Sequence, residues 1–232
     1  MITMKSIISL FISLIFALSV NAQTSIIPYF GATGSKYFLS STDDTDLYLA
    51  SMRKIHTPKL GYRFGVDVTH SLSDKVALRT GFGFQDMGEK VPITELRPAI
   101  FDFDSYKEVY HYQFIHLPIA IQYALTEREK WKSYLDFGGS VNWNVNNYSK
   151  IVKYADGKRV GHSKNDYDND IFQTINYGLD LGFGMNYKIS EKLSCRFLVS
   201  GDILLLPNIK DITYLYRYYN YGISVGIEYN LD

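Results

Sequence analysis

The sequence predicts an all-β fold: a transmembrane, antiparallel, up-and-down β-barrel of about eight strands. The first observation is the last stretch, Tyr218–Leu231, in which apolar and polar residues alternate without a break. A period of two is typical of a strand whose successive side chains lie on opposite faces of a sheet. The stretch is longer than most strands of globular proteins and suits a tilted crossing of a bilayer. Its middle is Ile and Val and its ends carry tyrosines, as expected where lipid meets head groups.

The second observation is that the same alternation recurs along the chain. Six further segments show it: Leu60–Val68, Val76–Gln85, Ile115–Tyr123, Leu135–Val145, Ile175–Tyr187 and Cys195–Ile203. An eighth strand around Ile26–Phe38 is the least regular, and its two faces cannot be assigned from the pattern.

The third observation is that short and long connections alternate. The short ones are Leu72–Asp74, Thr126–Lys130 and Ser190–Lys192, and the long polar ones are Ser40–Pro58, Gly88–Lys107 and Tyr148–Asn169. Outer-membrane barrels have short periplasmic turns and long outer loops. The sequence therefore predicts a barrel in the cell outer membrane with both termini in the periplasm.

The N-terminal segment reads as a secretory signal rather than as part of the fold. Lys5 precedes an apolar run from Ile7 to Val20, and Ala22 offers a small residue for cleavage. We expect a signal peptide over residues 1–22 and one outer-membrane β-barrel domain over residues 23–232.

Composition narrows the function classes. Without Lys5 the chain has 23 basic and 24 acidic residues, so its charge gives no support for nucleic-acid binding. The single cysteine, Cys195, has no partner for an internal disulfide.

The distribution of glycine predicts which face contacts lipid. Ten of the 17 glycines fall on the polar face of the predicted strands. The interior of a narrow barrel has room only for its own side chains, whereas a water-facing surface has no need of glycine. A soluble barrel with its apolar face around a ligand is the alternative, but the apolar face here is uniformly bulky, which favours lipid.

Charged residues on the polar face predict an interior plug, because confined charges must pair or neutralise. We expect Asp67 to lie near Arg79, Arg196 and Glu228 to lie near the periplasmic rim, and the glycines to make room for the arginines. A proton or ion path is the alternative. The charged set is Arg63, Asp67, Arg79, Asp136, Asp180, Arg196, Asp202 and Glu228.

Candidates for catalysis or metal binding are few. His111 and His116 are five apart in one strand, hence on opposite faces, and cannot share a metal. Clustered aspartates suggest an acidic protease pair in one long loop and a calcium site in another, but solvated loop charge is the preferred interpretation of both. These clusters are Asp43, Asp44 and Asp46, and Asp166, Asp168 and Asp170. The sequence therefore predicts no catalytic, cofactor-binding or metal-binding residue and no cofactor.

Two local patterns describe the loops. Asp156-Gly157 is typical of a type I′ hairpin turn, so we expect a two-stranded extension above the membrane. An aromatic girdle, or else a sticky surface for a glycan or partner protein, is expected at Tyr214, Tyr216, Tyr218 and Tyr219.

Two stretches carry a family resemblance: Lys59–Val66 continued by Leu72–Phe82, and Tyr112–Tyr123 with Leu117-Pro118 at its centre. The first resembles the second and third strands of the PorT-like outer-membrane β-barrel family of the Bacteroidota, and the second resembles that family's next strand. The chain departs from the family pattern by ending in Leu231-Asp232 instead of an aromatic residue. The resemblance implies an outer-membrane location and, for the family's named member, a role in protein secretion and gliding-type export.

The sequence thus predicts a non-enzymatic outer-membrane barrel that contributes to secretion or to surface contacts through its loops. The expected partners are outer-membrane lipids and secretion-machinery or surface proteins. The alternatives are a small barrel enzyme, a hydrolase or acyltransferase, and a narrow channel.

Overall fold

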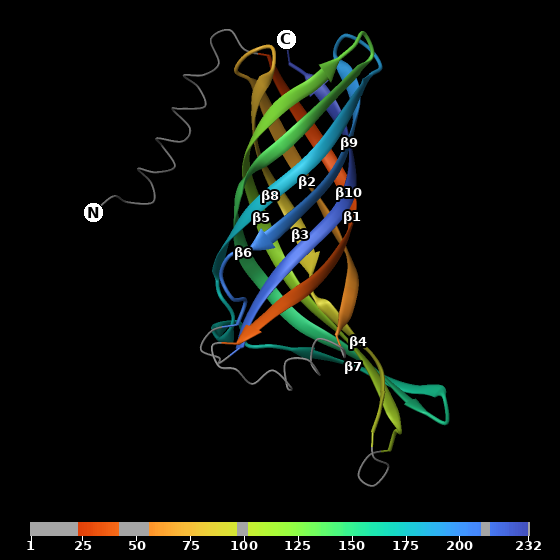
Figure 1. Cartoon of the computed structure of the whole chain (residues 1–232). Helices are drawn as coiled ribbons and strands as arrows, with labels where there is room; N and C mark the ends of the chain where they lie inside the picture. The colour runs from red at the N-terminus through yellow and green to blue at the C-terminus, as the bar shows by residue number, and fades with distance from the viewer. Residues whose placement is uncertain (1–22, 42–55, 97–101, 210–213, 232) are drawn as a thin grey trace, which may run out of the picture.

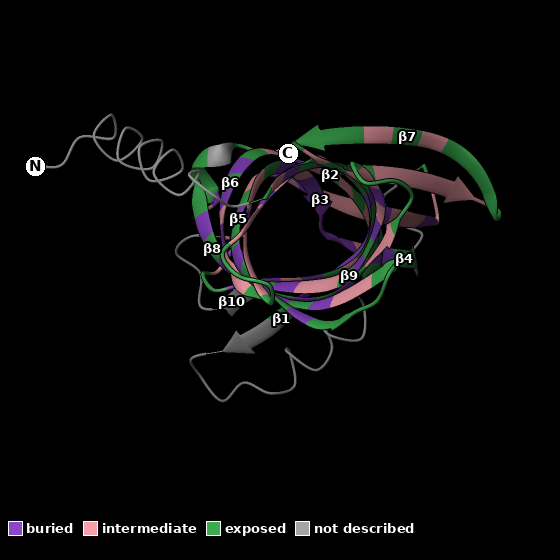
Figure 2. Ribbon diagram, turned by 90° about the horizontal axis from the view of Figure 1, so that it is seen from above, coloured by how far each residue is buried: buried purple, intermediate pink, exposed green. Residues whose placement is uncertain are grey.

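The computed structural model describes residues 23–41, 56–96, 102–209 and 214–231. It contains ten strands, eight of which close into a ring, shown in Figure 1 from the side and in Figure 2 along its axis. The ring strands are β1 (Thr24–Ser41), β2 (Thr57–Ser71), β3 (Val76–Met87), β5 (Ser105–Glu127), β6 (Trp131–Ala155), β8 (Ile175–Lys188), β9 (Leu193–Leu204) and β10 (Tyr214–Asn230). The signal peptide predicted for residues 1–22 lies outside the described residues.

The ring is closed by its first and last strands. β1 pairs with β10 antiparallel from Ser25↔Asn230 to Ser41↔Tyr214. This confirms the prediction that Tyr218–Leu231 pairs with the strand near Ile26–Phe38. Closure leaves no unpaired edge in the ring, which a barrel needs in a medium without water.

The two faces of the wall are those that the alternation predicts. Ile223 and Val225 in β10 are 57% and 47% exposed, and Leu181 in β8 is 61% exposed, all on the outer surface. Their neighbours Ser224 and Asp180 are buried inside. The sequence pattern did not assign the two faces of β1. In the structure Ile27 and Thr33 point inward and Phe30 points outward.

Short turns gather at one end of the barrel and long connections at the other; we name these the turn end and the loop end (Figure 1). The turns after β2, β5 and β8 lie at the turn end, as do the start of β1 and the end of β10. Within the described residues no helix has the length and apolarity needed to cross a membrane.

Two strands outside the ring extend the wall at the loop end. β4 (Glu89–Glu95) pairs with the start of β5, and β7 (Lys158–Asp166) pairs with the end of β6. The described part of Gly88–Lys107, expected as a loop, therefore belongs largely to a hairpin, and Tyr148–Asn169 contains the two-stranded extension that the sequence predicts. The turn of the second hairpin is the one predicted, since Asp156 and Gly157 have φ of 50° and 71°.

Glycines shape the interior, but around aromatic rings instead of the arginines we expected. Tyr29 on β1 has Gly226 and Gly65 as its cross-strand neighbours, and Gly83 follows on the next strand. A Cβ at Gly65 would lie 2.9 Å from the Tyr29 hydroxyl oxygen. Tyr134 similarly lies directly over Gly184. Small residues thus let two large rings lie across a narrow lumen.

The lipid-facing assignment predicts the effect of a charge on the wall. Leu181→Arg should destabilise the protein in bilayers by about 2–4 kcal/mol, since an arginine near the midplane must leave water. Val160→Arg on β7 is the control, because Val160 is 56% exposed but lies in the hairpin beyond the ring. Unfolding in urea from lipid vesicles measures both. Equal costs for the two variants would contradict the assignment.

Candidate functional site

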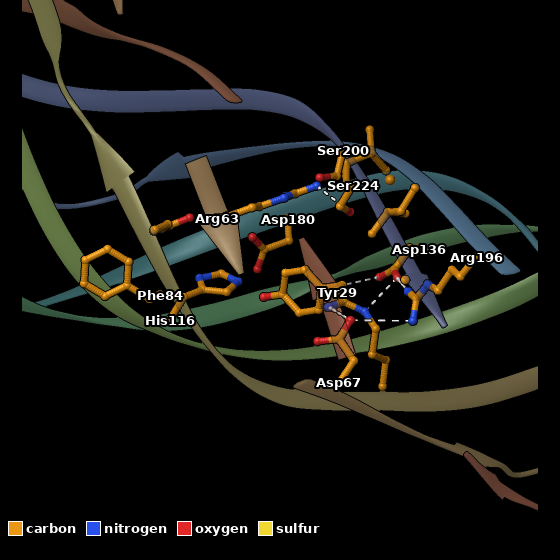
Figure 3. A pocket seen from close by; sticks show the side chains of 16 residues that line it. Tyr29, Arg63, Asp67, Phe84, His116, Asp136, Asp180, Arg196, Ser200 and Ser224 are labelled. Carbon is orange, nitrogen blue, oxygen red and sulfur yellow. Dashed lines mark hydrogen bonds and ion pairs between the residues drawn. The ribbon is translucent and has the colours of Figure 1, made fainter. Parts of the chain in front are cut away.

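The ring strands bring inward-facing charged residues together in a layer in the middle of the barrel, and Figure 3 shows most of their side chains. Arg79 on β3 donates from Nε to Asp136 on β6 over 2.8 Å and from Nη1 to Asp67 on β2 over 3.3 Å. Arg196 on β9 reaches the same carboxylates, with its guanidinium 3.5 Å from Asp67 and 3.6 Å from Asp136. Four side chains from four strands thus form a neutral, buried square of two arginines and two aspartates.

Hydrogen bonds from the wall complete this square. Gln122 on β5 donates from Nε2 to Asp136 over 3.0 Å, so that carboxylate accepts from two side chains. The Arg196 guanidinium also lies 5.4 Å from the centre of the Tyr134 ring, a cation–π distance. A buried charge is tolerated only where such partners replace water.

A second charged group lies next to the square, toward the loop end. Asp180 on β8 and Asp202 on β9 are direct cross-strand neighbours and both are buried. Asn220 donates to Asp202 over 3.2 Å, while Arg63 donates to Ser224 over 3.1 Å. The His116 ring hydrogen-bonds Asn142 over 2.8 Å. The sequence predicted these charges, but their grouping depends on barrel register.

The space between these side chains is small. A cavity of about 30 Å³ lies among them, lined by Tyr29, Arg63, His116, Asp180 and others shown in Figure 3. That volume has room for roughly two water molecules. At the turn end, by contrast, the barrel opens into a vestibule of about 550 Å³. The lumen therefore narrows from a wide mouth to a filled centre.

An aromatic cluster fills the lumen at the loop end. Its buried members come from five strands and from Phe172, which directly follows the 3₁₀ helix η2 (Asn169–Ile171). They are Tyr37, Met87, Tyr112, Phe114, Phe172, Leu204 and Tyr218. Rings of Tyr112 and Tyr218 lie 5.0 Å apart at 57°, a favourable tilted arrangement.

One carboxylate is enclosed by this cluster. Glu89, the first residue of β4, accepts hydrogen bonds from the hydroxyls of Tyr218 and Tyr112. Burial raises the pKa of Glu89 to about 7, although the two tyrosine hydrogen bonds oppose the shift. His56 lies 4.0 Å away, and burial lowers its pKa. Burial thus favours the uncharged form of both groups.

A further buried ion pair, near Glu89 in the chain, joins β2 and β3. Lys59 donates from Nζ to Asp86 over 2.6 Å and to the Met87 carbonyl over 3.1 Å. The His111 ring contacts the same carboxylate at 3.1 Å and stacks on Tyr148 with ring centres 4.5 Å apart. These groups tie β2, β3, β5 and β6 together where the hairpins leave the ring.

The structure separates several residues that the sequence grouped. His111 and His116 do lie on opposite faces of β5, as predicted. The prediction that Tyr218 belongs to an exposed girdle is wrong, because its side chain is 1% exposed and points inward to Glu89. The aspartates at 43, 44 and 46 lie outside the described residues, as do the side chains of Tyr214 and Tyr216.

The second aspartate group, Asp166, Asp168 and Asp170, forms ordinary loop contacts. Asp166 pairs with Lys164, and Asp168 accepts from the backbone N–H of Asp170 over 3.0 Å. Among the described residues, no three His, Cys, Asp or Glu side chains come close enough together to hold a metal ion.

Sequence reasoning missed Glu89, Lys59 and Asp86. Glu89 and Lys59 fall at the ends of alternating segments, where the period no longer predicts a face. The one signal in the sequence is the glycine at position 88. In the structure Gly88 has a φ of 151° and separates β3 from β4. The Glu89 side chain directly after it points into the lumen.

The fold and its charged interior define a membrane β-barrel, and the family comparison agrees. The outer membrane protein beta-barrel domain matches residues 21–214. The chain therefore belongs to this family of outer-membrane β-barrels. No curated protein matches it in sequence.

Solved outer-membrane barrels are similar over most of their length. Neisserial surface protein A shares 11% identity, with 88% of this chain and 96% of that one covered and a TM-score of 0.45. The Ail protein of Yersinia pestis shares 8%, with 90% and 100% covered and a TM-score of 0.39. The outer membrane protease OmpT of Escherichia coli shares 7%, with 92% and 98% covered and a TM-score of 0.38.

The central square predicts a large effect of removing one charge. Asp136→Asn should cost about 3–5 kcal/mol, because Arg79 and Arg196 are then left with one carboxylate between them. Asp156→Asn is the matched control: it lies in the exposed type I′ turn, where asparagine fits, and should change stability by less than about 0.5 kcal/mol. Urea unfolding in vesicles at neutral pH compares them. A small cost for Asp136→Asn would contradict the pairing.

Glu89 predicts a pH dependence of stability. Its pKa of about 7 in the folded protein exceeds the ordinary 4.5, so the folded state holds the proton more tightly. The stabilisation is therefore complete below pH 4.5, decreases as pH rises through about 7 and is lost above it. Glu89→Gln should flatten this part of the profile, whereas Glu129→Gln in an exposed turn should not. Unchanged pH dependence in Glu89→Gln would contradict the buried-acid assignment.

Proposed function

We propose that this protein is a non-enzymatic outer-membrane barrel that acts by contact at its two ends and not by transport. The filled lumen is the observation that supports this proposal. The charged layer leaves a cavity of about 30 Å³, and the aromatic cluster occupies the loop end. An eight-stranded barrel has an interior just wide enough for such side chains.

The proposed orientation places the turn end in the periplasm. The first described residues of β1 and the last of β10 both lie at this end, together with the three short turns (Figure 1). Outer-membrane barrels keep short turns on the periplasmic side. The β4–β5 and β6–β7 hairpins then project outside the cell.

The two ends offer different surfaces for partners. The vestibule at the turn end carries mixed charge, a composition suited to a periplasmic protein with complementary charges. Its charged residues are Lys75, Glu127, Arg128, Glu129, Lys130, Lys132, Lys188, Glu191 and Glu228. We further propose, from the resemblance to PorT-like proteins, that the contact serves protein secretion, with the vestibule as the periplasmic docking surface.

A low conductance is expected of the purified protein. In planar bilayers it should give no stable ohmic channel, because ions would have to cross the Arg–Asp square and the aromatic cluster. Removing residues 149–165 and rejoining the strands should not open one, since the square lies within the ring. Large, stable channels in either form would contradict the contact model and favour a channel.

The vestibule can be tested by crosslinking in cells. Photocrosslinkers at Lys132 and Lys188 in the vestibule should capture periplasmic partners, while one at Leu181 on the lipid face is the control. Folding of each variant is checked by the faster gel migration of the unheated barrel. If the vestibule positions capture nothing beyond the control, the proposed docking surface is wrong. Hydrolase or acyltransferase activity of the pure protein would favour the enzyme alternative.

A further inference from the structure

The hairpins at the loop end carry a row of lysines across one face of the sheet. Lys90 on β4 pairs with Val109 on β5, Val109 with Lys150 on β6, and Lys150 with Lys164 on β7. In the next row on this face, Lys107 pairs with Val152. We name Lys90, Lys107, Lys150 and Lys164 the lysine patch.

The patch places like charges side by side. Directly opposite residues in an antiparallel pair have Cβ atoms about 5 Å apart, and like charges there destabilise the pairing. Both Lys150 and Lys164 lie over the Tyr148 ring, with their Nζ atoms 5.6 Å and 4.6 Å from its centre. The acidic groups that the ladder assigns to this face are Asp166, paired with Lys164, together with Glu95 and Asp86. The Asp86 carboxylate is buried and already paired with Lys59. Basic charge therefore exceeds acidic charge on this face.

The face that bears the patch continues the lipid-facing surface of the barrel. On β5 the outward positions run from Ile119 and Ile115 through His111 to Val109 and Lys107 without a change of phase. On β6 the register shifts by one residue at Val145. Before the shift the odd-numbered residues, such as Trp143, lie on the outer face. After it the even-numbered residues Tyr148 and Lys150 lie there. The patch thus begins where the apolar surface ends.

The hairpins also bend away from the barrel axis. In Figure 1 the β6–β7 hairpin leaves the ring sideways, and in Figure 2 it lies outside the ring's outline. Where the wall bends outward at the loop end, its outer face no longer points sideways but tilts toward the membrane that surrounds the barrel. The patch is therefore directed at the membrane surface around the barrel.

We propose that the lysine patch binds the phosphate-bearing head groups of acidic lipids in the leaflet next to the loop end. Lysines near a membrane surface attract anionic lipids, and a tyrosine between them suits the interface between lipid and water. An acidic head group also relieves the repulsion between Lys150 and Lys164. The inference rests on the barrel's membrane location, and it holds for either orientation and for any function of the vestibule.

Trp143 provides a local probe of lipid composition. It is one of two tryptophans and faces outward on β6, below the patch. Lys150 is seven residues further along the strand, or roughly 23 Å at about 3.3 Å per residue. The acyl chains of a lipid bound at the patch would extend into the membrane on this side of the barrel, where Trp143 faces outward. In a Trp131→Phe background, Trp143 is the sole tryptophan emitter.

The experiment compares quenching of Trp143 by brominated phosphatidylglycerol and by brominated phosphatidylcholine at equal mole fraction in vesicles. The acidic lipid should be enriched about fivefold at Trp143, the order of preference that one interfacial lysine provides. Lys150→Gln/Lys164→Gln should abolish the enrichment. Lys153→Gln/Lys158→Gln is the matched control, with one lysine removed from each strand of the same hairpin but on the other face.

The outcomes separate the explanations. Equal quenching by the two lipids in the parent, or equal loss of enrichment in both double variants, would overturn the proposal. Trp131 in a Trp143→Phe background reports the turn end, and its lipid preference should not respond to Lys150→Gln/Lys164→Gln. If inorganic phosphate at millimolar concentration removes the enrichment, the patch is a site for soluble anions and the lipid proposal fails. A vestibule that captures no partner leaves this result unaffected.

Discussion

The square of Arg79, Arg196, Asp67 and Asp136 is the interaction on which the rest of the structure depends. Closing eight strands satisfies every backbone edge but leaves a narrow interior in which polar side chains face one another. Each of the four charges comes from a different strand, so the square joins β2, β3, β6 and β9 across the lumen. A buried charge without its partner is costly. The square therefore couples the register of distant strands.

The lumen on either side of the square differs in character. Toward the turn end it widens into the charged vestibule, and toward the loop end it passes through amides into the aromatic cluster around Glu89. Tyr29 and Tyr134 lie across the lumen only because glycines face them. Large rings over glycines, with paired charges between them, thus fill the barrel, and the proposed contacts with partners would be made at its two ends.

Much of the ring could be predicted from the sequence, because the two-residue period is local and strong. It gave the strands, the lipid-facing side, the closing pair and the proximity of Asp67 to Arg79. The same period puts Tyr218 on the inner face of β10, and the girdle interpretation was wrong because it considered only residue type. The period could not show the one-residue shift at Val145, which reverses the faces of β6 and sets Lys150 on the outer side. Glu89 and Lys59 were missed because their roles depend on strand pairings beyond the end of the regular pattern.

In this protein side chains, and not water, occupy the middle of the barrel. Labelling of single cysteines by a membrane-impermeant maleimide, in a Cys195→Ser background, measures whether water reaches this layer. Ser194 and Ser200 lie on the same strand and inner face, the first in the vestibule and the second at the charged layer. In the folded protein, the thiol of Ser194→Cys should react as fast as a thiol exposed to water. The thiol of Ser200→Cys should stay unreactive, whichever side of the membrane the maleimide is added to, until the barrel is unfolded. Rapid labelling of Ser200→Cys in the folded barrel would show an open aqueous lumen and contradict the account.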